Sequence, residues 1–368
     1  MVDVALFVPS LRGGGAERAM VTLANSFAAR GLTVDLLLAS KNGPYLENVV
    51  STVRVVDLQA GRVIKALLPL MRYLRREQPV AMLSAMGHAN VTAILARMLA
   101  QVKTRVVVSE RGLISGEHAI AQGLAARLNF ILIPWLYPKA DAICAVSQAA
   151  SADLATFINL PRQRVQTLYN PFDLPLIKMR AAEPVEHSWF SPGQPPVLLS
   201  IGRLNEAKDF HILISAFARL RRKRAVRLMI LGEGELRAYL QSVVSDCGLT
   251  GDDVQMPGFV NNPFIYLVRC SLFVLSSRRE GLPGVLIEAM ACGAPVVSTD
   301  CLSGPDEILE GGKWGKLVPV GDADALAAAM AAVLDTPRGQ LPDVRQRARD
   351  FGLDRAVDTY LNILELNG

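Results

Sequence analysis

Residues 271–299 read SLFVLSSRREGLPGVLIEAMACGAPVVST and combine the signals of a strand, a loop, a helix and a second strand. The apolar run at the start is typical of a buried strand. Pro283 suits the first turn of a helix, where the missing N–H of proline costs nothing, and Gly293 suits the end of that helix. The final APVVST begins another strand. This order predicts a parallel sheet that is covered by helices.

Glu280 and Glu288 flank the turn that begins this helix. The free backbone amides around Gly284 provide an anion site at a helix N-terminus. A carboxylate accepts hydrogen bonds from two hydroxyls, so the diols of a sugar or a ribose are its natural partners. The stretch therefore suits a diphosphate with a diol on each side. On spacing alone, an equally good interpretation is that Glu280 is exposed and that Glu288 complements the helix dipole.

The alternation of strands and helices runs through all 368 residues and restarts at residue 196. Between the two halves, residues 170–196 are rich in proline and polar residues and lack clear periodicity. We therefore predict an α/β protein with two doubly wound, Rossmann-like domains. The N-terminal domain spans residues 1–172, a linker spans 173–195, and the C-terminal domain spans 196–344. Ligands bind at the carboxyl ends of the strands in such sheets, so we expect the two domains to face each other across a cleft.

The composition excludes several classes of protein. Hydrophobic residues make up 51% of the chain and charged residues 20%, as in a packed globular protein. Five scattered cysteines without a CxxC pair predict reduced thiols and no zinc site. No apolar run is long enough to span a membrane, and the N-terminus does not have the pattern of a signal peptide, so we expect a cytoplasmic protein. The net charge of +5 favours anionic partners such as nucleotides or phospholipids, and no motif supports nucleic acid.

Arg203 and Lys208 flank the turn in SIGRLNEAKDF, residues 200–210, where the first strand of the second half ends. Phosphates bind at such strand ends. A guanidinium grips a phosphate through two hydrogen bonds, and a lysine adds a point charge. We interpret the pair as a phosphate site, although Lys208 by itself would be a typical solvated residue.

The loop PSLRGGGAERAM, residues 9–20, contains three consecutive glycines. They allow a ligand or the opposing domain to approach the backbone closely, although a merely flexible turn is the alternative. A dinucleotide site would need a third glycine where Arg18 stands and an acidic residue at the end of the next strand. That strand ends in LLLASKN. The sequence therefore disfavours a nicotinamide-dependent dehydrogenase.

Three polar residues follow strands of the predicted first domain. His88 comes after VAMLSAM, and Glu110 and Arg111 come after RVVVS. We expect Glu110 and Arg111 to lie at the same rim of the sheet. A single histidine is more often structural than catalytic, so His88 is a candidate for the cleft and no more.

Other charged segments have simpler interpretations. Asp322 and Asp324 stand at a predicted helix start, where Asp322 is a good N-cap, so we predict no metal site there. The basic run at 219–227 is typical of a helix C-terminus. The basic, leucine-rich segment 63–77 and the apolar FILIPWLYP at 130–138 leave two interpretations open, ordinary core elements or peripheral contact with an anionic membrane.

Together these motifs resemble the retaining glycosyltransferases of family 4 (group 1), which have the GT-B fold. The resemblance covers nearly the whole chain. It rests on GGGAER, YPKADAICAVSQAASADL, LYNPFD, SIGRLNEAKDF, MILGEGELR, MPGF and, above all, EGLPGVLIEAMACGAPVVSTDCLSGPDEIL. The run CLSGPDEIL is most similar to bacterial members that build lipopolysaccharide cores or lipid-linked oligosaccharides. The resemblance also implies that a last helix, at about 345–368, joins the N-terminal domain.

The resemblance implies a role for each motif. Glu280 would hold hydroxyls of the donor sugar and Glu288 the ribose, while Arg203 and Lys208 would neutralise the leaving diphosphate. We thus expect Glu280, Arg203 and Lys208 to be catalytic. The implied donor-binding residues are Gly14, Gly15, Arg203, Lys208, Gly258, Phe259, Glu280, Leu282, Gly284, Val285 and Glu288.

The chain departs from the family at one point. Many members have a histidine after the strand that here ends in Ser109–Glu110–Arg111, which leaves the sugar or acceptor side to Arg111 or His88. The resemblance implies transfer of a hexose or N-acetylhexosamine, usually from a UDP-sugar, to a glycan or lipid-linked acceptor. It implies no metal or other cofactor, and it places the enzyme in the cytoplasm or at the inner face of the cytoplasmic membrane. The alternatives are a non-catalytic sugar-nucleotide-binding or glycan-binding subunit and, with less support, the dehydrogenase.

Overall fold

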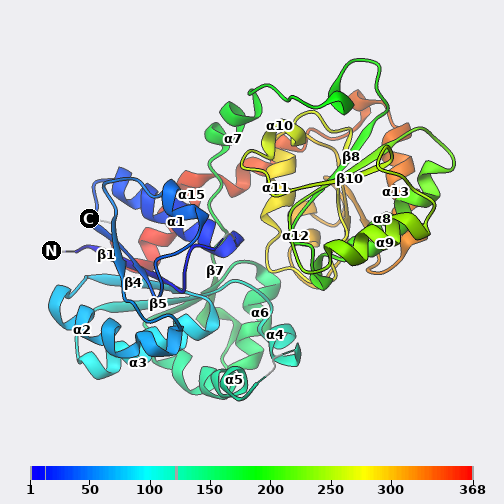
Figure 1. Cartoon of the computed structure of the whole chain (residues 1–368). Helices are drawn as coiled ribbons and strands as arrows, with labels where there is room; N and C mark the ends of the chain where they lie inside the picture. Colours follow the sequence, from blue (N-terminus) through cyan, green and yellow to red (C-terminus); the bar gives the residue numbers. More distant parts are fainter. Residues whose placement is uncertain (1, 13, 121–122, 367–368) are drawn as a thin grey trace. The chain divides into compact units, whose positions relative to one another are not determined.

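The computed structural model describes residues 2–12, 14–120 and 123–366, and the chain forms two compact units (Figure 1). The first unit comprises Met1–Pro171 together with Leu353–Gly368, and the second comprises Phe172–Gly352. Each unit contains one parallel sheet with helices on both faces. These two sheets confirm the α/β, Rossmann-like class that the alternating pattern predicts.

The sheet of the first unit has the strand order β3-β2-β1-β4-β5-β6-β7. Its strands are β1 (Val4–Val8), β2 (Val34–Leu38), β3 (Arg54–Asp57), β4 (Ala81–Ala85), β5 (Arg105–Glu110), β6 (Ala142–Ala145) and β7 (Val165–Thr167). The direction in which strands are added reverses between β1 and β4. Loops separate at such a reversal, so this is where a doubly wound sheet offers room for a ligand.

Two helical layers cover this sheet because successive side chains of each strand point to opposite faces. Val107 packs in the core beneath α1 (Gly15–Ala29) and α15 (Leu353–Leu364). Its neighbours Val106 and Val108 pack in the opposite core, beneath α2 (Leu67–Glu77), α3 (Gly87–Ala100), α5 (Leu124–Leu136) and α6 (Gln148–Phe157). Figure 1 shows the blue α1 and the red α15 on one side of the sheet and α2 and α3 on the other. The short α4 (Ile114–Ile120) follows β5.

The sheet of the second unit has the strand order β10-β9-β8-β11-β12-β13. Its strands are β8 (Val197–Ile201), β9 (Arg227–Leu231), β10 (Val254–Gly258), β11 (Leu272–Leu275), β12 (Val296–Thr299) and β13 (Lys316–Val318). Its helices are α7 (Leu174–Ala181), α8 (Phe210–Arg221), α9 (Arg237–Asp246), α10 (Phe264–Leu267), α11 (Gly284–Ala291), α12 (Pro305–Leu309), α13 (Ala323–Asp335) and α14 (Arg345–Ala348). Here the order reverses between β8 and β11, the two strands that precede the Arg203–Lys208 loop and the Glu280 loop.

Residues 173–195, for which we predicted a linker, fold within the second unit. They include α7, and the Trp189 side chain is buried with the Arg227 guanidinium 5.0 Å from its ring centroid. Proline content suggested a linker, but buried apolar side chains decide that this segment is part of a core. The chain returns to the first unit at Leu353. Of the segment at about 345–368, which we expected to join the N-terminal domain, α14 therefore belongs to the second unit and only α15 packs on the first sheet.

No helix in the described part of the chain has both the length and the apolar character needed to span a bilayer.

Candidate active site

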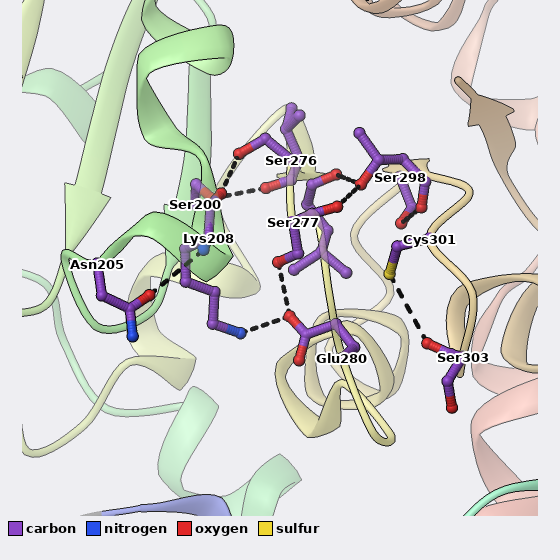
Figure 2. Close-up of polar contacts among 12 residues, drawn as sticks. Ser200, Asn205, Lys208, Ser276, Ser277, Glu280, Ser298, Cys301 and Ser303 are labelled. Carbon is purple, nitrogen blue, oxygen red and sulfur yellow. Dashed lines mark hydrogen bonds and ion pairs between the residues drawn. The ribbon is translucent and has the colours of Figure 1, made fainter. Parts of the chain in front are cut away.

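Glu280 lies in the loop between β11 and α11, at the carboxyl edge of the second sheet. Its Oε1 accepts a hydrogen bond from the Ser277 hydroxyl at 2.6 Å and lies 2.5 Å from the Lys208 ammonium. Figure 2 shows Lys208 reaching toward Glu280 from the neighbouring loop, with Ser277 on the strand side of the carboxylate. The side chains of Lys208 and Glu280 are 19% and 11% exposed, so the pair is largely shielded from water.

The Lys208 backbone is held by both loops. Lys208 ends a short 3₁₀ turn, Glu206–Lys208, and the Asn205 side chain caps this turn by accepting from the Lys208 N–H at 3.3 Å. The Ser276 hydroxyl donates to the Lys208 carbonyl at 2.8 Å, and Arg278 N–H donates to the Ala207 carbonyl at 2.8 Å. These contacts join the loop after β8 to the loop after β11. The ammonium is therefore positioned by the fold and not only by its own flexible chain.

Asp209 strengthens this junction from a left-handed conformation, with φ +47°. Its buried carboxylate accepts from Arg278 Nε at 2.6 Å and from a second guanidinium nitrogen at 3.3 Å. A left-handed aspartate is uncommon, and here two charge-assisted hydrogen bonds stabilise it. Asn205, Asp209, Ser276 and Ser277 thus support the two predicted site residues, although no motif in the sequence singled them out. The sequence pattern that could have identified these residues is local, because they are short polar side chains that follow two strands, which are neighbours in the sheet.

Arg203 is exposed at the end of β8, and among the described residues its side chain has no hydrogen-bond or ion-pair partner. Gly202 precedes it, and a Cβ there would lie 3.0 Å from Lys208 Cε. Gly232, at the end of the adjacent β9, has φ +139°, and a Cβ there would lie 2.0 Å from the Gly202 carbonyl oxygen. Glycine is required at Gly232, and it lets the strand ends pack closely beneath the Arg203–Lys208 loop.

The helix α11 begins where the sequence predicted, with Pro283 directly before it and Gly293, at φ +77°, just beyond its end. Leu282 is buried, whereas Gly284 and Val285 are partly exposed. The loop after β12 approaches this turn closely, because the Ser303 hydroxyl donates to the Gly281 carbonyl at 2.7 Å.

Glu288 occupies the second turn of α11 and is 3% exposed. A solvated surface glutamate does not fit this burial. Gly258 ends β10 and Phe259 follows it, at the same edge of the sheet. Gly258 has φ +99°, and a Cβ there would lie 2.6 Å from Glu233 Oε1, while Phe259 is 58% exposed. The fold therefore brings Arg203, Lys208, Glu280 and Phe259 to the carboxyl ends of the strands of one sheet.

In the first unit, Gly14 is the N-cap of α1 and Gly15 is its first residue. A Cβ on Gly14 would lie 2.1 Å from a carboxylate oxygen of Glu17, so a larger residue here would displace the end of that flexible side chain. Gly13 lies outside the described residues. That these glycines approach the donor from the other domain stays a prediction.

Glu110 and Arg111 are neighbours at the end of β5, but their side chains lie on opposite faces of the sheet. Arg111 donates to Asn170 Oδ1 at 2.7 Å and contacts Met20 and Tyr360, beside α1 and α15. Glu110 is buried on the α3 side. Both residues therefore lie at the carboxyl end of β5, as predicted, but their side chains face different helical layers. His88 is exposed in the first turn of α3.

Two comparisons with known proteins bear on this geometry. Residues 195–336 match the family model described as "Glycosyl transferases group 1", and residues 13–175 match "Glycosyltransferase Family 4". A Campylobacter jejuni enzyme, N-acetylgalactosamine-N,N'-diacetylbacillosaminyl-diphospho-undecaprenol 4-alpha-N-acetylgalactosaminyltransferase, is 31% identical over 343 residues, which cover 91% of both chains. The chain belongs to family 4 of the glycosyltransferases, group 1.

Other relatives agree with this assignment. The lipopolysaccharide core biosynthesis glycosyltransferase LpsE of Rhizobium meliloti is 35% identical to the present glycosyltransferase over 178 residues, which cover 47% of this chain and 51% of LpsE. Among solved structures, Anabaena Alr3699/HepE in complex with UDP-glucose superposes with a TM-score of 0.83 at 19% identity, covering 99% of this chain and all of HepE. This similarity shows that the chain and HepE share a fold, which agrees with the predicted GT-B class.

The remaining predicted features of the glycosyltransferase have structural roles. Asp322 caps α13 by accepting from Ala325 N–H at 2.8 Å, as predicted. The basic run at the C-terminal end of α8 is paired with carboxylates, namely Arg219–Asp324, Arg221–Asp253 and Arg224–Asp335. Within the described residues, no group of three or more histidine, cysteine, aspartate or glutamate side chains is arranged to hold a metal ion.

Proposed function

We propose that this glycosyltransferase moves a hexose or an N-acetylhexosamine from a nucleotide sugar, in first place a UDP-sugar, to a glycan or lipid-linked acceptor, with retention of the anomeric configuration. The observation that carries the proposal is the shielded Lys208–Glu280 contact beside the exposed Arg203 at one sheet edge. The proposal is also supported by the name of the Campylobacter relative, which acts on a diphospho-undecaprenol-linked sugar, and by the UDP-glucose in the HepE structure.

Each residue has a chemical role in this proposal. Departure of a nucleoside diphosphate leaves negative charge on the phosphate oxygens, and Lys208 and Arg203 neutralise it together with the backbone amides at the start of α11. Glu280 accepts hydrogen bonds from the hydroxyls of the transferred sugar, and Glu288 from those of the ribose. Gly258 and Phe259 lie beside the base. The acceptor hydroxyl attacks from the face that the diphosphate leaves, and the departing phosphate takes up its proton.

The same residues would make the reaction independent of metal ions. A diphosphate leaving group needs about two positive charges, and Lys208 and Arg203 supply two. The shared contact with Glu280 orients Lys208 but also offsets part of its charge. Arg203, whose side chain is exposed, is therefore the residue that we assign to direct phosphate binding.

We further propose that the enzyme works at an anionic membrane surface when its acceptor is lipid-linked. The helix α5 exposes Leu128, Ile131 and Trp135, at 52, 62 and 75%. Their spacing of three and four residues puts them on one face of the helix. An amphipathic helix with tryptophan on its apolar face is typical of interfacial binding. A cytoplasmic location at the inner face of the membrane follows from this proposal.

A thermal-shift and product assay tests the function. The purified chain is screened with UDP-, GDP- and ADP-sugars, and a true donor at about a hundred times its dissociation constant should stabilise the protein by about 2.7 kcal/mol. Addition of a lipid-linked glycan acceptor should then release the free nucleoside diphosphate. Stabilisation without release would favour a non-catalytic binding subunit. Stabilisation by NADH and by none of the sugar nucleotides would favour the dehydrogenase.

A further inference from the structure

A buried polar cluster lies beneath the start of α3 in the first unit. Glu110 is 2% exposed and accepts hydrogen bonds from the Tyr137 hydroxyl and, at 3.3 Å, from the Asn90 amide. The same Asn90 amide nitrogen lies 3.0 Å from the Ser109 carbonyl oxygen and 3.0 Å from the Tyr137 hydroxyl. Three polar side chains from β5, α3 and the turn after α5 thus meet in an otherwise apolar core. Such clusters constrain geometry strongly because each member loses solvation.

The cluster holds the turn that leads from β4 into α3, residues 86–88. Met86 has φ +79° and ψ 136°, a conformation that a residue with a side chain rarely adopts. Its N–H donates to the Ser109 carbonyl at 3.2 Å, and its carbonyl accepts from Asn90 N–H at 2.9 Å. A Cβ on Gly87 would lie 3.3 Å from Glu110 Oε1, so the carboxylate lies close to the turn. His88 follows on the exposed side.

Glu110 can exist in two protonation states near neutral pH. Burial raises the pKa of Glu110, the charge of Glu117 on α4 adds to this effect, and the resulting pKa is about 7. The hydrogen bonds from Tyr137 and Asn90 and the charge of Arg111 act in the opposite direction. As a carboxylate, Glu110 accepts from both neighbours. As an acid, it needs an acceptor, and the buried Asn90 Oδ1 has no hydrogen-bond partner among the described residues.

The two states have different consequences for the turn. Donation from the acid to Asn90 requires this amide to rotate, because its nitrogen now faces Glu110. Rotation removes the hydrogen bond from Asn90 to the Ser109 carbonyl, which ties α3 to β5. The turn before α3 is then less firmly held.

We propose that Glu110 is a positioning residue for sugar transfer, which holds the turn at residues 86–88 in its reactive geometry only when Glu110 is ionised. The turn lies at the carboxyl edge of the first sheet, where ligands of doubly wound domains bind. The inference rests on the proposed function, since it assigns the acceptor or sugar side of the reaction to this edge. Glu110 itself acts through Asn90 and the turn and does not touch the substrate.

The test compares the pH profiles of kcat and KM for the wild type, E110Q, E117Q and Y137F between pH 5.5 and 8.5. Wild-type kcat should rise with pH through an inflection near 7, and E110Q should lack this limb and be about ten- to a hundredfold slower at pH 8. Loss of the Glu117 charge should move the inflection to lower pH, and loss of the Tyr137 hydroxyl should move it to higher pH. A purely structural role for Glu110 predicts lower stability with an unchanged profile.

Two measurements do not depend on turnover. Infrared difference spectra should show a buried carboxylic acid that is lost near pH 7 in the wild type and absent in E110Q. At pH 8, the amides of residues 86–90 should exchange faster in E110Q than in the wild type. Unchanged exchange would overturn the inference. So would an inflection that moves to higher pH in E117Q and to lower pH in Y137F. If the carboxylic acid titrates and the amides exchange as expected but no sugar is transferred, the result would instead count against the proposed function.

Discussion

Lys208 Nζ lies 2.5 Å from Glu280 Oε1, although the two residues are 72 positions apart in the sequence. Their strands, β8 and β11, are adjacent in the second sheet, so the loops that follow them meet at one edge. The consequence is a carboxylate and an ammonium that are oriented by each other and by Ser277. This contact allows the two charges to be tested separately.

Replacement of Lys208 by methionine should lower kcat about a hundred- to a thousandfold, because a fixed charge that stabilises the leaving diphosphate is lost. Lys313→Met is the matched control, since Lys313 also pairs with a glutamate, Glu310 at 3.0 Å, but at an exposed site. The control should retain wild-type kinetics. Equal loss of activity in both variants would remove Lys208 from the catalytic site.

Glu280→Gln should separate charge from geometry, because a glutamine oxygen can still accept from Lys208 and Ser277. We expect turnover to fall about ten- to a hundredfold, because the hydrogen bonds at this position lose the contribution of the negative charge, while the affinity for the free nucleoside diphosphate stays the same or increases. The increase would arise because Lys208 is no longer partly neutralised. Steady-state kinetics and calorimetry measure the two quantities, and weaker diphosphate binding would contradict the assignment.

Glu288→Ala should weaken nucleotide binding by about 1.5–3 kcal/mol if its carboxylate accepts from the ribose hydroxyls. Titration calorimetry with the free nucleotide measures this loss, and Glu235→Ala, at an exposed position, is the control. Comparison with the 2′-deoxynucleotide sharpens the test, since this ligand should lose affinity for the wild type but not for Glu288→Ala. An equal loss in both proteins would exclude a contact with the 2′-hydroxyl.

Activity should persist in excess EDTA, and the product should keep the anomeric configuration of the donor. Arg203 and Lys208 would supply the positive charge that a metal ion supplies elsewhere. The proton coupling constant at the anomeric carbon of the product, measured by NMR, decides the second point. Activity that returns only with Mg²⁺ or Mn²⁺ would refute the first half, and an inverted product the second.

Membrane binding should depend on the exposed face of α5. Serine at Leu128, Ile131 and Trp135 should reduce co-flotation with anionic liposomes at low salt, because the apolar area that enters the interface is lost. Charge reversal at Lys65 and Arg72 tests the electrostatic part, and Met179→Ser, an exposed apolar residue of the second unit, is the control. Flotation that none of these changes alters would leave both segments as ordinary surface elements.

The sequence predicted those features that depend on neighbours along the chain. The alternation of apolar strands and amphipathic helices was sufficient for two parallel sheets, because each period reports which faces are buried. Pro283 and Gly293 mark the ends of α11 correctly, since caps depend on local backbone chemistry. Arg203, Lys208 and Glu280 could be selected because they follow strands, and parallel strands end at the same edge.

Tertiary structure alone decided which of these residues touch. The order of β8 and β11 in the sheet brings Lys208 to Glu280, and no local pattern encodes strand order. Glu110, the last residue of β5, and Arg111, which follows it, contact different helical layers, because adjacent side chains of an extended chain point to opposite faces. Burial of Trp189 places the proline-rich segment within the second unit. The sequence by itself determined the elements and the types of chemistry at their ends, whereas packing between distant segments determined the contacts, since these depend on which faces meet in space.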